Sequence, residues 1–135
     1  MAALTAPRNT PERIGIPAYP VKAATTVHQG SLVVLDAGYA APGRTATGLI
    51  AIGRADASAT AVAAGDALVP VRAGNFKFAN STAGDLIAQA DVGADCYIAD
   101  DQTVAKTSAG ATRSIAGKVI AVESDGVWVK VGFGN

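Results

Sequence analysis

The chain contains few side chains that could act in nucleophilic catalysis. A serine or cysteine nucleophile needs a neighbouring base, and the only histidine is His28, at the end of a proline-rich N-terminal stretch. We interpret His28 as a polar residue at a turn rather than as a general base or a metal ligand. Cys96 is the only cysteine and opens the apolar segment CYI. Such a position is typical of a buried structural thiol, so we expect no nucleophile here.

Metal and phosphate chemistry has no better support. One histidine and one cysteine cannot complete a structural zinc site. The acidic residues lack the D-x-[DN]-x-[DN]-G spacing of a calcium loop, and the glycines match no P-loop or dinucleotide-binding pattern. Asp100 and Asp101 could in principle serve a hydrolase, but adjacent residues in a strand usually point apart. We expect no metal and no cofactor, with helix caps and turns as the roles of Asp85, Asp91, Asp95, Asp100 and Asp101.

The composition argues against several classes of partner. Eleven basic and eleven acidic residues give a net charge of zero without a basic run, so we expect no direct contact with nucleic acid or a membrane. No apolar run approaches the roughly 18 residues that span a bilayer. The first residues do not resemble a secretory signal, and the lone cysteine indicates folding in a reducing cytoplasm. Val, Ile and Leu number only 14, 8 and 6, which predicts a thin core that gains burial from partner surfaces.

The elements that would position these residues are mostly short strands. A continuous apolar run predicts a strand at 32–36, which ends at the turn Ala37-Gly38. Alternation with a period of two predicts a second strand at 48–54. Further along, the patterns predict a strand–turn–strand unit at 96–106 and a hairpin at 115–133.

Two further segments complete the expected fold. LVPVRAGNFKF (68–78) predicts a hairpin that turns at Ala73-Gly74, and Pro70, which cannot donate a ladder hydrogen bond, would place its strand at an edge. The window 80–92 is the only helical candidate and predicts one short helix. The expected fold class is therefore mainly β, a small β-barrel or β-sandwich-like domain with one short helix and an extended N-terminal arm.

The N-terminal arm is expected to span residues 1–28, with a short pairing stretch near 23–27, and the β-rich domain residues 29–135. Four prolines in the first 20 residues prevent a helix and stiffen an extended path, which lowers the entropy lost on docking. Apolar residues could anchor such an arm to a neighbouring surface while charged residues fix its register. The expected partner-binding residues are Arg8, Glu12, Arg13, Ile14, Ile16 and Tyr19.

Several short patterns resemble the head decoration, or capsid cement, proteins of tailed bacteriophages. They lie mainly within 84–133: D-V-G before C-Y-I, then D-D-x-T-V, T-R-S-x-A-G and a closing D-G-V-W-V. The stretches 29–43 and 48–56 are also similar to that family. The resemblance therefore covers most of residues 29–133, and none of its patterns is a catalytic signature.

The resemblance implies a structural virion protein and not an enzyme. Such a protein would be made in the host bacterial cytoplasm, bind the outer surface of the head and cement capsomers of the major capsid protein. Its expected partners are the major capsid protein and itself, as a homotrimer or alternatively a dimer. Another virion component, such as a tail-tube or head-completion protein, would share the composition. A small hydrolase or sugar-binding module would need an aromatic platform or a carboxylate pair in a concave site.

Overall fold

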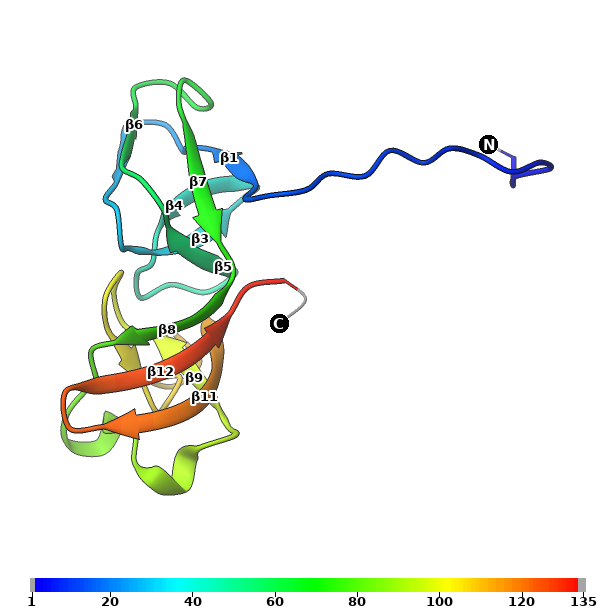
Figure 1. Ribbon diagram of the computed structural model, residues 1–135. Coiled ribbons are helices and arrows are strands. Elements are labelled where there is room, and N and C mark those ends of the chain that lie inside the picture. Colours follow the sequence, from blue (N-terminus) through cyan, green and yellow to red (C-terminus); the bar gives the residue numbers. More distant parts are fainter. Residues whose placement is uncertain (1, 134–135) are drawn as a thin grey trace.

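The computed structural model describes residues 2–133, which form a mainly β structure of three antiparallel sheets. Figure 1 shows two β-rich halves stacked on one another, with an extended N-terminal segment leaving the upper half. We call the large sheet of the upper half the N-terminal sheet and that of the lower half the C-terminal sheet. The expected mainly β, sandwich-like fold class is confirmed.

The strand order of each sheet is as follows. The N-terminal sheet runs β1 (Ala18–Pro20), β7 (Leu68–Arg72), β5 (Ile50–Ala55), β3 (Leu32–Asp36), β4 (Tyr39–Pro42). The C-terminal sheet runs β10 (Val104–Ala105), β9 (Asp95–Ile98), β11 (Ile115–Glu123), β12 (Gly126–Val131), β8 (Gly74–Phe78). The small third sheet pairs β2 (Thr25–Val27) with β6 (Ala59–Ala61).

Strand β3 is shared by two hydrophobic cores. Val33 belongs to the N-terminal core, together with residues of β2 and β6, whereas Leu32 and Val34 belong to the C-terminal core, most of whose residues come from the C-terminal sheet. A strand covered on both faces needs successive apolar residues, which accounts for the unbroken run LVVL. The N-terminal core consists of Val21, Val27, Val33, Ala40, Ile52, Ala55, Ala61, Val69 and Val71.

The two edges of each large sheet are connected by a single bridge. In the N-terminal sheet Val21 bridges Ala40, and in the C-terminal sheet Ala79 bridges Thr103. Each sheet therefore curls around its core, although over residues 2–133 neither ladder continues into a closed barrel. Because the sheets curve in this way, small residues such as valine and alanine can fill both cores.

The locally encoded units follow the sequence patterns. Strands β9 and β10 pair with each other across the Asp-Asp turn, and β11 and β12 form the C-terminal hairpin. Strand β3 ends at the expected turn, where Ala37 and Gly38 have φ values of 50° and 89°. Two consecutive positive φ angles are typical of the type I′ turn that joins hairpin strands.

The expected hairpin at 68–78 is wrong, because its two strands belong to different sheets. β7 pairs with β1 and β5, whereas β8 pairs with β12. The prediction that Pro70 lies on an edge strand is also wrong, because β7 lies between β1 and β5 in the N-terminal sheet. Pro70 accepts the Asp56 N–H at 2.8 Å but has no N–H to return. The β5–β7 ladder accordingly ends one residue earlier, at Ala55.

The expected short helix at 80–92 is replaced by two single 3-10 turns, η1 (Ala83–Asp85) and η2 (Gln89–Asp91). Ala83 has a φ of 54°, which an α-helix cannot contain. The Asn80 side chain also binds both the N–H and the carbonyl of Ile87, each at 2.9 Å. These side-chain bonds take the place of helical hydrogen bonds.

The extended arm is shorter than the expected 1–28. Residues 2–16 are exposed and contain no strand, but β1 and β2 belong to the body, where Val21 and Val27 are fully buried. Residues 18–27 contribute only two strands of three residues each, which are too short to show a clear alternation in the sequence. Met1, Gly134 and Asn135 lie outside the described residues. The term "arm" below means residues 2–16.

Candidate functional site: a groove between the two large sheets

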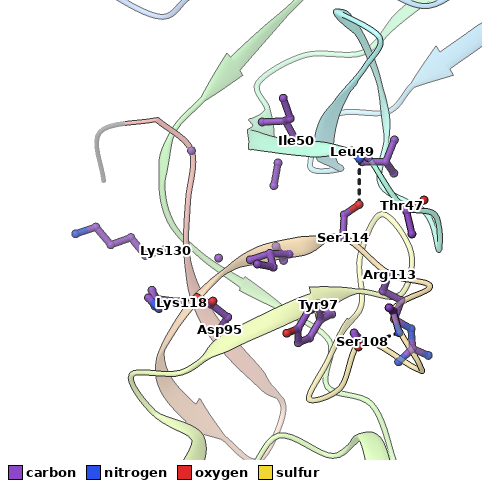
Figure 2. A pocket seen from close by; sticks show the side chains of 17 residues that line it. Thr47, Leu49, Ile50, Asp95, Tyr97, Ser108, Arg113, Ser114, Lys118 and Lys130 are labelled. Atoms are coloured by element: carbon purple, nitrogen blue, oxygen red, sulfur yellow. Dashed lines mark hydrogen bonds and ion pairs between the residues drawn. The ribbon is translucent and has the colours of Figure 1, made fainter.

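An open groove of about 760 Å³ lies where the N-terminal and C-terminal sheets meet, and we call it the inter-sheet groove (Figure 2). One wall is the segment 47–51, which leads into β5. The other wall is formed by β9 and the first residues of β11, with Lys130 and Gly132 contributing from the end of β12. The groove therefore combines four separate stretches of the chain.

The base of the groove is held by Ser114. This buried serine accepts the Leu49 N–H at 3.0 Å, and its hydroxyl donates to the Ala46 carbonyl at 2.8 Å. Both bonds connect the segment that leads into β5 with the segment that leads into β11. Since the hydroxyl uses its proton and one lone pair in these bonds, Ser114 fixes the distance between the two walls.

The lining of the groove is largely apolar, and part of it is open to solvent. Leu49 and Ala116 are buried beneath it, while Ile50 and Ile115 are 52% and 49% exposed. Tyr97 adds an aromatic ring from β9. In Figure 2, Tyr97 lies between a cluster of charged side chains at one end of the groove (Asp95, Lys118 and Lys130) and Arg113 at the other.

The charged cluster at the first end contains one carboxylate and two ammonium groups. Lys118 binds Asp95 at 2.7 Å, whereas Lys130 forms no ion pair with any of residues 2–133. Figure 2 shows these three side chains gathered on one side of the groove. Among the described residues, the positive charge of Lys130 is therefore left without a counter-charge.

At the other end, Arg113 is held against the neighbouring loop. Its guanidinium binds Asp85 at 3.2 Å and the Thr107 carbonyl at 3.1 Å. The Thr107 hydroxyl, followed by Arg113, keeps the pKa of Asp85 below its ordinary value. The Arg113 Nε is buried and meets no hydrogen-bond partner within the described chain. This end of the groove is positioned by internal contacts.

The residues considered for catalysis are not among those that line this groove. His28 is exposed and lies near Ser31 and Asp101, but Ser31 donates its hydroxyl to Asp101 at 3.3 Å and none of the hydrogen bonds within residues 2–133 involves the imidazole. The arrangement therefore differs from a serine–histidine pair. Cys96 is fully buried, which confirms the structural thiol, and burial raises the pKa of this thiol to about 12.

The five aspartates that the sequence predicts to act as helix caps or turn residues make separate structural contacts. Asp91 accepts the Ala88 N–H at 2.7 Å and Asp100 the Gln102 N–H at 2.9 Å, so their expected cap and turn roles are confirmed. The other three bind side chains instead, as described above. Within residues 2–133, no three histidine, cysteine, aspartate or glutamate side chains are grouped so that they could hold a metal ion.

The predicted partner-binding residues fall into two groups. Arg8, Glu12, Arg13 and Ile14 are exposed on the arm, with Ile14 88% exposed. Ile16 is also exposed, at the point where the arm reaches the body. Tyr19 lies in β1 opposite Val69 and packs against the N-terminal core, so it is a residue of the body and not of the arm.

No sequence pattern indicates the groove, because its lining residues are of types common in strands and have no fixed spacing. Comparisons with protein-family models, with curated proteins and with solved structures found no match. None of the helices within residues 2–133 is long and apolar enough to cross a membrane.

Proposed function

We propose that this chain is a structural virion protein that binds the outer surface of a tailed-phage head and cements capsomers of the major capsid protein. It acts there without catalysis, as a homotrimer. The proposal starts from the resemblance of residues 29–133 to head decoration proteins. The alternative is another virion component, attached to the tail or to the head–tail connection.

The observation that carries the proposal is the combination of a packed β body with a free arm. The arm is exposed over its whole length, yet it contains Leu4 and Ile14, which are 72% and 88% exposed. Apolar side chains on a stiff, extended segment gain free energy when a partner covers them, and the prolines reduce the entropy lost in doing so. A chain with a net charge of zero also permits close packing of many copies on one surface.

The test measures binding to purified, undecorated heads of the phage that encodes the chain. The full chain should sediment with these heads and saturate them. Deletion of residues 2–16 should weaken binding at least tenfold, which corresponds to about 1.4 kcal/mol. The deletion stops before β1, so the free energy of unfolding of the body should remain unchanged.

A matched pair of substitutions separates the arm from general surface apolarity. Ile14→Ser removes an exposed apolar side chain from the arm, and Val62→Ser removes one from the body, where Val62 is 81% exposed. Only the first should reduce head occupancy. A full chain that binds purified tails but not heads would contradict the proposal and favour the alternative.

A further inference from the structure

We propose that the arm of one copy docks in the inter-sheet groove of a second copy of this chain. The inference deepens the proposed function, on which it rests, by assigning the arm one receptor. In Figure 1 the arm extends away from its own body, so the groove of the same copy is left open. A 15-residue extended segment can reach about 50 Å, enough to cross to a neighbouring molecule.

The apolar surfaces of the arm and the groove are complementary. Ile14 extends from the arm without a covering group, and Ile50 and Ile115 lie half exposed in the groove. Docking would cover all three side chains at once. Gly15 has a φ of 101°, a conformation that glycine adopts without strain, so the arm can bend beside Ile14 to follow the groove.

The charge of the arm at Glu12 is also opposite to the charge of the groove at Lys130. Alternate residues of an extended chain share a face, so Glu12 lies on the same side as Ile14, and Arg13 on the opposite side. Neither Glu12 nor Lys130 forms an ion pair within residues 2–133. With Ile14 beside Ile115, Glu12 would face Lys130 at the charged end of the groove, while Arg13 would point to solvent.

The backbone of the groove offers an open strand edge. Ile50 and Ala51 pair with β3 on one side, but on the other side β7 pairs with β5 only at Arg54 and Ala55. Residues 12–14 lie between Pro11 and the bend at Gly15, so they form an extended stretch in which each residue retains its N–H. Such a segment can add to an open edge as an extra strand.

The contact is of the head-to-tail kind, because the arm of one copy meets a different surface of the next. Head-to-tail contacts close into rings when the rotation between copies allows it. Arm-in-groove docking is therefore compatible with the cyclic trimer proposed above, in which every arm and every groove is occupied.

The test is done in solution, without heads, by cross-linking two different variants. Ile14→Cys and Ile115→Cys are mixed, treated with a short bis-maleimide and analysed by mass spectrometry. Both positions are exposed, and the native Cys96 is fully buried. The pair should cross-link at least tenfold more than the control pair of Ile14→Cys with Val62→Cys. A yield equal to that of the control would overturn the proposal.

A charge exchange gives a second readout. Glu12→Lys and Lys130→Glu should each reduce self-association in sedimentation experiments, and the double variant should restore it. Failure of the double variant to restore association would count against the docking. A chain that carries both Ile14→Cys and Ile115→Cys and closes only on itself would show that the arm occupies its own groove, which also overturns the proposal.

These outcomes are independent of the head-binding test. Efficient cross-linking by a chain that fails to bind heads would overturn the proposed function and leave the docking in place. Head binding without cross-linking above the control would overturn the docking alone.

Discussion

The backbone N–H of Leu49 donates a hydrogen bond to the hydroxyl of Ser114 at 3.0 Å, across 65 positions of sequence. This bond joins the two large sheets at the base of the inter-sheet groove. Ser114→Ala would leave the buried Leu49 N–H without a partner, which typically costs about 1–3 kcal/mol. We expect a decrease of that size in the free energy of unfolding, measured by urea denaturation. Ser124→Ala, in an exposed turn, is the control and should have little effect; equal effects would contradict the assignment.

Gly117 is required for the close approach of β11 and β12. A Cβ atom at this position would clash with the backbone carbonyl of Lys130, which cannot move aside as the end of a flexible side chain could. Gly117→Ala should therefore destabilise the chain by about 1–3 kcal/mol or more. Gly84→Ala is a matched control, because a Cβ there meets nothing within 4 Å. Thermal unfolding should show a clear decrease in Tm for Gly117→Ala only. Equal Tm values for Gly117→Ala and Gly84→Ala would contradict the packing argument.

Asp36 predicts a defined pH dependence of stability. Lys22 and Arg44 bind its carboxylate at 2.7 and 2.8 Å, and these hydrogen bonds lower the pKa of Asp36. A lowered pKa in the folded state stabilises the fold above the ordinary carboxyl pKa near 4, and this stabilisation is lost as the pH falls further. Asp36→Asn should cost no more than about 1 kcal/mol at pH 7, since the group is partly exposed. The difference from the native chain should shrink between pH 5 and pH 2; a difference that grows on acidification would contradict the sign.

Cys96 should resist alkylation as long as the chain is folded. Its thiol is fully buried with a pKa of about 12, and the thiolate is the reactive species. At pH 8 we expect iodoacetamide to react at least about a thousandfold more slowly with the native chain than with the urea-unfolded chain. A cysteine placed at Val62 should react at the unfolded rate in both states. Rapid labelling of native Cys96 would mean that β9 opens readily.

The same thiol predicts a loss of stability in alkali. Because the pKa of Cys96 is raised in the folded state, the unfolded chain ionises first as the pH rises above about 9. Replacement of Cys96 by alanine should remove this part of the alkaline loss, at the cost of a small cavity. Unfolding curves at pH 7 and pH 10 separate the two effects.

The parts of the fold that depend on neighbouring residues could be predicted from the sequence. The turn at Ala37-Gly38 and the C-terminal hairpin need only local φ preferences and alternation. The hairpin expected around Ala73-Gly74 failed because alternation shows that a strand has two faces but not which strand it pairs with. β7 and β8 keep the same pattern although they belong to different sheets.

The candidate site shows the same limit. The arm was detectable because prolines beside Ile14 form an unusual local composition. The groove was not, since Ile50, Tyr97 and Ile115 become neighbours only after two sheets have packed, and each is an ordinary strand residue on its own. The sequence predicts that Tyr19 belongs to the arm, because no pattern in it indicates that β1 pairs with β7.

The attachment of the arm through β1 has a mechanical consequence. β1 is an edge strand of three residues, held to β7 by the pairs Ala18–Pro70, Tyr19–Val69 and Pro20–Leu68. Tension on a docked arm would load the bond from the Val71 N–H to the Pro17 carbonyl, at 3.0 Å, and then these pairs. The next point of resistance is Val21, which is fully buried and donates its N–H to the Ala67 carbonyl at 2.9 Å. Under tension β1 would therefore separate from β7 before the N-terminal core around Val21 is disturbed.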